Sequence, residues 1–373
     1  MMKSEIMNFL VHLLLLGTVT ATLTQYNNRR LTAPIVINTW NFTNANSRAW
    51  QELKNQHSAL DAIEHGCSQC EVDRCDGTVG WGGSPSETGE VTLDAMIMDG
   101  ETYDVGAVGG LRRIKNAISV ARLVLERTNH TLLVGDMATE FAKSFGLKEE
   151  TLSSAESERI LTDWQNKSCQ PNYWRNVSPN PRTSCGPYHP IPITNEINHR
   201  QVTDDDFQLF DAEDMRYNNV QVKSPTPAAR SHDTIGMIAM DSTRRLASGT
   251  STNGLRHKIL GRVGDSPVPG AGSYAAKEAG AAAATGDGDV MMRFLLSYQA
   301  VENLRRGMSA DEAARDVILR QIRRTGKPYP EAAVIVLSKD GNYGAACCGI
   351  RKFPFVVSDK LDQVRTHVIG CFN

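Results

Sequence analysis

Apolar residues recur along this chain with two different periods, and these predict strands and helices in separate stretches. Continuous apolar runs at residues 34–40, 91–98 and 235–240 are typical of buried strands. Apolar positions at helical spacing predict helices over residues 45–65 and 111–127. Because strands and helices do not alternate strictly, the pattern favours a layered α+β fold over a doubly wound sheet.

More local signals place the remaining elements. The further predicted elements are strands at 132–134 and 246–251, a hairpin of 332–337 and 343–347, and helices at 138–145, 290–305 and 310–324. The last of these helices opens with a capping box of Ser309 and Glu312, and Asp340-Gly341 is the turn of the hairpin. Residues 271–284 are small and apolar, which permits close packing.

Residues 149–230 break the pattern, because they are rich in Ser, Asn, Asp and Pro and show little periodicity. A connection of this length is unusual inside a compact domain, so a disordered linker between two domains is one interpretation. Cys169 and Cys185 favour another, in which a disulfide staples a partly ordered excursion.

The N-terminus predicts a secretory signal peptide over residues 1–21. Lys3 precedes an apolar run at residues 9–16, and small residues follow up to Ala21. A membrane anchor would need about 20 apolar residues, and this run is shorter and contains His12. We find no later segment of the sequence that is long and apolar enough to span a bilayer.

Composition excludes some partners. The formal net charge of −2 favours neither nucleic acid nor an anionic membrane. Four sequons follow the leader, at Asn41, Asn129, Asn166 and Asn176, and glycosylation of some of them is expected in a secreted chain.

All eight cysteines follow the leader, and a secreted chain can oxidise them. Cys70 and Cys75 are close enough in sequence for a local bridge, as are Cys169 and Cys185; Cys371 could pair with Cys347 or Cys348. Cys67 and Cys70 have the spacing of a zinc or redox pair, but no second pair follows at suitable spacing, so disulfides are preferred.

The bond between Asp233 and Thr234 is the strongest candidate for chemistry. A threonine inside a chain has no built-in base, whereas a threonine at a new N-terminus has its own α-amine, which titrates near ~8. A hydroxyl paired with a terminal amine is an effective nucleophile. His232, Asp233 and Thr234 cannot form a triad, because consecutive side chains of an extended segment point to opposite faces. A cap or turn at a strand start is the simpler interpretation of these residues alone.

Three downstream motifs favour the chemical interpretation. Thr252 lies in Gly-Thr-Ser-Thr-Asn-Gly on the next predicted strand, where its hydroxyl could hold the freed amine, although polar turn composition would also explain it. Arg262 and Asp265 offer a cation and an anion suited to a zwitterion, although a surface ion pair is the ordinary alternative. Residues 285–289, Thr-Gly-Asp-Gly-Asp, expose backbone N–H groups suited to an oxyanion hole and lack the spacing of calcium and nucleotide loops.

Together these motifs closely resemble the glycosylasparaginase (aspartylglucosaminidase) family of the N-terminal-nucleophile hydrolase superfamily. The resemblance runs from about residue 34 to the C-terminus and weakens over residues 149–230. It implies an αββα four-layer sandwich. It also implies self-cleavage into an α chain, 22–233, and a β chain, 234–373, which together build one catalytic domain.

The resemblance also implies the roles of individual residues. Asp233 would assist an N-to-O acyl shift, Thr234 would be the nucleophile and Thr252 would support its amine. Arg262 and Asp265 would clamp the free ends of an asparagine moiety, while Thr285 and Gly286 would form the oxyanion hole. The other substrate-binding residues implied are Trp40, Val263, Gly264, Asp287 and Gly288, where Trp40 has core packing as its alternative.

Disulfides are implied in the same way. The family's pairings match Cys70–Cys75, Cys169–Cys185 and Cys347–Cys371. A fourth family bridge is lost, because Ala314 and Ser338 stand where its cysteines would be. Cys67 and Cys348 are left without assigned partners.

We therefore expect an amidohydrolase that cleaves the bond between N-acetylglucosamine and asparagine in glycoasparagines, without a metal or organic cofactor. The expected assembly is two α and two β chains, and the expected address is the secretory pathway, most specifically the lysosome. The alternatives are a related isoaspartyl peptidase/L-asparaginase and a secreted, non-catalytic binding protein. The second alternative need not cut itself.

Overall fold

The computed structural model describes residues 33–192, 234–327, 329–361 and 364–373. All that follows concerns the compact unit of residues 31–373. The predicted leader, Asp233 and the end of the irregular segment after residue 192 lie outside the described residues. In the described part of the chain, no helix has the length and apolar character needed to cross a membrane.

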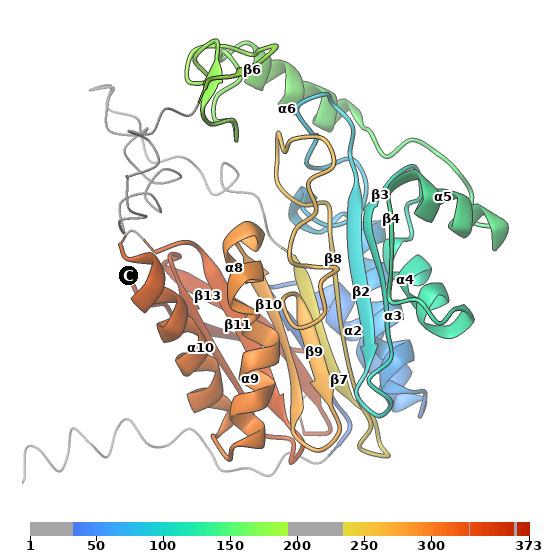
Figure 1. The fold of residues 1–373 in the computed structure, drawn as a ribbon. Helices are drawn as coiled ribbons and strands as arrows, with labels where there is room; N and C mark the ends of the chain where they lie inside the picture. Colours follow the sequence, from blue (N-terminus) through green and yellow to red (C-terminus); the bar gives the residue numbers. More distant parts are fainter. Residues whose placement is uncertain (1–32, 193–233, 328, 362–363) are drawn as a thin grey trace, which may run out of the picture. The chain divides into compact units, whose positions relative to one another are not determined.

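An eight-stranded sheet forms the first layer of the fold (Figure 1). Its order is β14-β13-β1-β7-β8-β2-β3-β4, in which only the β3–β4 pair is parallel. The bounds of these strands are β1 Ile35–Thr39, β2 Leu93–Asp99, β3 Val105–Leu111, β4 Leu132–Val134, β7 Ile235–Met240, β8 Leu246–Thr252, β13 Lys352–Asp359 and β14 Arg365–Gly370. The predicted pairing of residues 235–240 with 246–251 is confirmed.

A four-stranded antiparallel sheet, β12-β11-β10-β9, forms the second layer. Its strands are β9 Ser273–Ala276, β10 Gly280–Gly286, β11 Ala332–Ser338 and β12 Tyr343–Cys348. The predicted hairpin of residues 332–337 and 343–347 is confirmed by the β11–β12 pairing. Gly236 of β7 faces this sheet so closely that a side chain there would lie 2.8 Å from the Ala283 methyl group, which shows why small residues fill β10.

The helices of the described residues are α2 Thr43–Lys54, α3 Ala59–Asp73, α4 Ala117–Arg127, α5 Gly135–Ser144, α6 Ala155–Gln165, α8 Gly288–Phe294, α9 Leu296–Arg305 and α10 Ala310–Thr325, with a short 3-10 turn at Cys75–Gly77. Helices α2 to α5 pack on the first sheet, and α9 and α10 pack on the second. Alternate side chains of β7 point to opposite faces of the first sheet. Met237 packs in the core with α2, α3 and α4, whereas Ile238 packs against the second sheet.

The third core lies between the second sheet and α9 and α10. Three cores between four layers make an αββα sandwich, so the expected α+β fold is confirmed (Figure 1). The capping box predicted at Ser309 opens α10.

Two long helices predicted from apolar spacing are each broken in the structure. The helix expected over residues 45–65 is α2 and α3, and Ser58 starts α3 with a capping box that includes Asp61. The helix expected over residues 290–305 is α8 and α9, which are separated by Leu295 in the left-handed conformation at φ 50°. The helical spacing of apolar residues continues across both breaks, so this spacing alone did not reveal them.

Other elements were missed. The helix expected from residue 111 begins at Ala117, because residues 105–111 form strand β3. A side chain at Gly106 would lie 2.0 Å from the Ala121 carbonyl oxygen, so glycine lets α4 pack directly on the sheet. The segment expected to be irregular contains α6 and a two-stranded ribbon of β5, Val177–Ser178, and β6, His189–Pro190.

Three disulfides stabilise the fold, and they are the three that the resemblance implies. They join Cys70 to Cys75, Cys169 to Cys185, and Cys347 to Cys371. Cys67 and Cys348 are free thiols and both are buried.

Candidate active site

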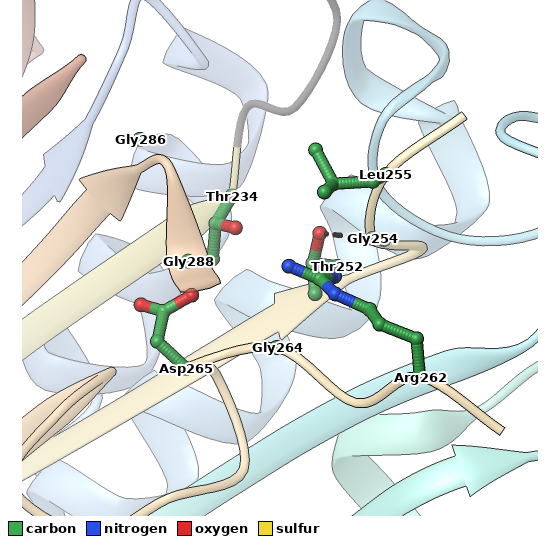
Figure 2. A pocket seen from close by; sticks show the side chains of 9 residues that line it. All are labelled: Thr234, Thr252, Gly254, Leu255, Arg262, Gly264, Asp265, Gly286 and Gly288. Atoms are coloured by element: carbon green, nitrogen blue, oxygen red, sulfur yellow. Dashed lines mark hydrogen bonds between the residues drawn. The ribbon is translucent and has the colours of Figure 1, made fainter. Parts of the chain in front are cut away.

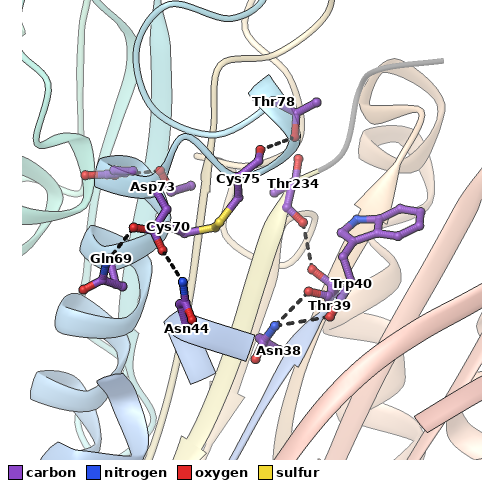
Figure 3. The surroundings of a disulfide bond; sticks show 12 residues. Asn38, Thr39, Trp40, Asn44, Gln69, Cys70, Asp73, Cys75, Thr78 and Thr234 are labelled. Atoms are coloured by element: carbon purple, nitrogen blue, oxygen red, sulfur yellow. Dashed lines mark hydrogen bonds between the residues drawn. A yellow bond between two sulfur atoms is a disulfide. The ribbon is translucent and has the colours of Figure 1, made fainter. Parts of the chain in front are cut away.

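Thr234 immediately precedes β7 and is buried, and three hydrogen bonds fix its surroundings. Its backbone N–H donates to the Thr285 hydroxyl at 3.0 Å. The Thr39 hydroxyl donates to the Thr234 carbonyl oxygen at 2.7 Å and accepts from the Gly236 N–H at 2.9 Å (Figure 3). The strand therefore presents the nitrogen of the preceding peptide bond at a set position.

A small pocket lies beside this threonine (Figure 2). Its lining residues are Thr234, Thr252, Gly254, Leu255, Arg262, Gly264, Asp265, Gly286 and Gly288. Residues far apart in sequence meet here because β7 and β8 are adjacent, while β10 approaches from the second sheet. All of them except Gly254 and Leu255 were predicted as site residues.

Thr252 lies across from Thr234, since β7 and β8 pair Ile235 with Ser251. The Thr252 hydroxyl donates to the Thr78 carbonyl oxygen at 3.3 Å and accepts from the Gly254 N–H at 3.0 Å. A hydroxyl has two acceptor lone pairs, so one remains for a further donor. Thr78 in turn follows the Cys70–Cys75 disulfide, and its hydroxyl donates to the Cys75 carbonyl oxygen at 3.3 Å (Figure 3).

Asp265 is an ionisable group with an unusual environment. Its side chain is almost fully buried, and within the described ranges no hydrogen-bond partner reaches its Oδ2 atom. Burial raises the pKa of Asp265 to about 7, although the charge of Arg262 opposes that rise. A side chain at Gly288 would lie 2.5 Å from Asp265 Oδ1, so glycine leaves space in front of the carboxylate.

Among the described residues, four predicted site residues do not line the pocket itself. Thr285 lies behind it, where its hydroxyl accepts from the Thr234 N–H and from Trp40 Nε1 at 2.9 Å. Trp40 also packs edge-on against Phe353 in the core. The Asp287 side chain caps α8 by accepting from the Val290 N–H at 3.3 Å, and Val263 faces Gly109 of β3.

Besides Gly254 and Leu255, sequence reasoning missed four residues around the site: Thr39, Asp94, Ser266 and Asp289. Ser266 Oγ lies 3.5 Å from Thr234 Oγ1, so its hydroxyl is within hydrogen-bond distance of the nucleophile candidate. Asp94 is buried in β2 and accepts from the Gly110 N–H at 2.7 Å and the Gly264 N–H at 3.3 Å. A lone carboxylate inside an apolar strand was the available signal for Asp94.

The excursion stapled by Cys169–Cys185 packs against the loop that follows β8. Trp164 of α6 stacks on His257 with ring centroids 4.6 Å apart, and the Tyr173 hydroxyl donates to the Arg256 carbonyl oxygen at 3.2 Å. Trp174 Nε1 donates to Glu87 at 2.8 Å. The segment therefore supports the loop that carries Arg262 (Figure 1).

The free energy of unfolding is expected to fall as pH rises from about 4 to about 7. The folded chain holds the Asp265 proton more tightly than the unfolded chain, whose Asp265 has a pKa near 3.8 rather than about 7. Unfolding therefore releases a proton in this window, and the slope is negative. The loss amounts to as much as about 4 kcal/mol. Urea unfolding of an uncut Thr234→Ala background at several pH values measures it.

Asp265→Asn is expected to flatten this slope up to about pH 7, and Glu71→Gln is the comparison variant, which is expected to flatten it up to about pH 8. Glu71 is also buried, and desolvation raises its pKa to about 8, so its contribution extends to higher pH. Parallel pH profiles for Asp265→Asn and the parent would contradict the assignment of the slope to Asp265.

Comparison with known proteins finds a match over most of the chain. A family model described as asparaginase matches residues 22–366. The N(4)-(beta-N-acetylglucosaminyl)-L-asparaginase of Mus musculus is 53% identical over 340 residues, which cover 89% of this chain and 90% of the mouse protein. The Rattus norvegicus protein of the same name is 53% identical over 91% of this chain and 92% of its own length.

Proposed function

This chain belongs to the asparaginase family, and from that membership we infer that it is a hydrolase of linear amides with an N-terminal nucleophile. Its mammalian relatives are named for the cleavage of N4-(β-N-acetylglucosaminyl)-L-asparagine. The chain cleaves the same amide bond of glycoasparagines, which releases aspartate and a glycosylamine. The pocket beside Thr234 is the observation that carries this conclusion.

We propose that activation begins with a cut between Asp233 and Thr234. The Thr234 hydroxyl would attack the Asp233 carbonyl carbon, its N–H would become a free amine, and water would hydrolyse the resulting ester. The products would be an α chain, 22–233, and a β chain, 234–373, within one catalytic domain. The hydrogen bond from the Thr234 N–H to Thr285 supports this proposal, because it orients the bond to be broken.

We propose that the free amine of Thr234 then acts as the base for its own hydroxyl. The remaining lone pair of Thr252 would accept a hydrogen bond from that amine. Thr234 Oγ1 would attack the side-chain carbonyl carbon of the substrate, while Thr285 and the Gly286 N–H would stabilise the oxyanion. The glycosylamine leaves with a proton, and water then hydrolyses the β-aspartyl ester to release aspartate.

The remaining predicted residues would bind the ends of the amino acid. Arg262 would fork onto the α-carboxylate, and Asp265 would pair with the α-ammonium, for which its unpartnered Oδ2 atom is suited. Gly264 and Gly288 would let the substrate approach the backbone closely. Val263 would shape the loop that carries Arg262 and Asp265, and Asp287 would shape the segment that carries Gly286 and Gly288. Trp40 is the candidate for the sugar side, acting next to Thr285.

The disulfides and the sequons indicate the compartment of the protein. Three disulfides fit passage through the secretory pathway, and all four sequon asparagines are exposed. We propose the lysosome as the destination, because glycoasparagines arise where glycoproteins are degraded. We also propose an assembly of two α and two β chains.

A substrate comparison tests the function. The mature protein is expected to hydrolyse GlcNAc-Asn with a kcat/KM at least about tenfold above that for a β-aspartyl dipeptide, a difference of about 1.4 kcal/mol in transition-state binding. Both substrates are assayed on one preparation. A preference for the dipeptide would favour the isoaspartyl peptidase, and no turnover of either would favour a non-catalytic binding protein.

A further inference from the structure

Arg262 is already engaged by a carboxylate in the structure. Its Nε atom lies 3.3 Å and 3.2 Å from the two carboxylate oxygens of Asp289, and its Nη2 atom lies 2.9 Å from Asp289 Oδ2. The Arg262 side chain is 15% exposed and that of Asp289 is 41% exposed. Asp289 therefore holds one edge of a buried guanidinium from the solvent side.

The other edge of the guanidinium faces the pocket. Side chains placed at Gly254 and Gly264 would lie 3.1 Å and 2.9 Å from Arg262 Nη1, and both glycines line the pocket. Figure 2 shows the Arg262 side chain extending past Gly264 toward Thr252. A planar guanidinium can fork onto one carboxylate with each edge, so the pocket edge stays open for a second carboxylate.

Asp289 is distinct from the other acids near Arg262. Asp94 is occupied by two backbone N–H groups, and Asp265 faces Gly288. Among the ion pairs of the described residues, Arg262 pairs with Asp289. Removing Asp289 would therefore free the guanidinium on its outer side without disturbing those two acids.

We propose that Asp289 is a positioning residue for substrate recognition, which holds Arg262 so that its pocket edge meets the α-carboxylate of the substrate. The inference rests on the proposed role of Arg262 as the carboxylate clamp. Arginine has large rotamer freedom, and ordering such a side chain on binding weakens affinity. Asp289 orders the Arg262 side chain before the substrate binds, so this entropy is not lost on binding. The negative charge of Asp289 would repel the substrate carboxylate, but solvent around the exposed Asp289 screens that repulsion. The orientation of Arg262 therefore has the larger effect on affinity.

The test combines two variants with two substrates. The substrates are GlcNAc-Asn and its α-carboxamide analogue, which lacks the charge that Arg262 would bind. Asp289→Ala is expected to raise KM for GlcNAc-Asn about tenfold with little change in kcat. The same variant is expected to leave KM for the carboxamide unchanged, and Asp289→Asn, which keeps an acceptor oxygen, is expected to lie between wild type and Asp289→Ala.

Glu101→Ala is the matched control, because it also removes one acid from an ion pair, that of Glu101 with Lys277. This pair lies near the start of β8, whereas Thr252 lies at the end of that strand. A fall in KM in Asp289→Ala would show competition with substrate and overturn the proposal, as would equal effects on both substrates. If wild-type enzyme itself did not distinguish the acid from the carboxamide, the role proposed for Arg262 would fail instead.

Discussion

A Thr234→Ala variant is expected to remain one uncut chain without measurable turnover. Alanine removes the hydroxyl that would attack the Asp233 carbonyl carbon, so no terminal amine forms, and the same hydroxyl would be missing from the later reaction. Loss of a nucleophile lowers the rate by on the order of 10⁴-fold or more. Intact mass and N-terminal sequencing distinguish the uncut chain from a mature chain that begins Thr-Ile-Gly-Met.

Thr234→Ser provides the control, because it keeps the hydroxyl while losing only a methyl group. It is expected to cut and to retain some hydrolysis. The hydrogen bonds of Thr234 with Thr285 and Thr39 are made by its backbone, and among the described residues its side chain adds only a 3.5 Å contact with Ser266 Oγ, so both variants should fold. Two chains in purified Thr234→Ala would place the cleavage chemistry on another residue.

Acetylating the α-amine of GlcNAc-Asn is expected to lower kcat/KM roughly 30- to 5000-fold. This corresponds to a loss of about 2–5 kcal/mol in transition-state binding free energy. The acetyl group removes the positive charge that Asp265 would bind, and the carboxylate would be left buried without a partner. The space that Gly288 leaves in front of Asp265 is also limited, because a Cβ atom there would already lie 2.5 Å from Asp265 Oδ1. Steady-state kinetics with the two compounds on mature enzyme measure the effect.

The matched control for this experiment alters the far side of the sugar, which none of the residues lining the pocket is proposed to bind. Such a substrate is expected to react within a few-fold of GlcNAc-Asn. Intact glycoproteins should resist the enzyme for the same reason as the acetylated compound, since an internal asparagine has neither a free amine nor a free carboxylate. Equal rates for free and acetylated GlcNAc-Asn would remove Asp265 from the proposed clamp.

Local patterns predicted the elements whose signals lie within a few residues. The Ser309 capping box and the Asp340-Gly341 turn specify their structures through neighbours in sequence. Strand β13 gave no comparable signal, because Pro354 interrupts it and its pairing with β1 joins residues far apart in sequence. The breaks at Ser58 and Leu295 were hidden because apolar spacing continues across them.

The candidate site shows the same division. Thr234, Thr252, Arg262 and Asp265 lie in compact motifs, and the structure brings all four around one pocket. Asp94 and Thr39 act from strands distant in sequence through contacts with backbone groups. Such contacts leave no sequence motif, because a backbone carbonyl is present in every residue and a backbone N–H in every residue except proline. Only the sheet order places them beside the site.

The order of the eight-stranded sheet has a consequence for the cut protein. Strands β1, β2, β3 and β4 precede Thr234, whereas β7, β8, β13 and β14 follow it. In the sheet, β1 lies between β13 and β7, and β2 pairs with β8. The two products would be interleaved, so neither could leave without breaking several ladders of hydrogen bonds.

Cutting would thus leave the contacts in place while removing the covalent tether. An unfolded precursor can refold by itself, but two unfolded fragments must first collide. They no longer have the high effective concentration that a covalent linker provides. Mature enzyme that unfolds would be lost faster than it reassembles, and its lifetime would be set by its unfolding rate. Self-cleavage would make folding of this chain an event that happens once.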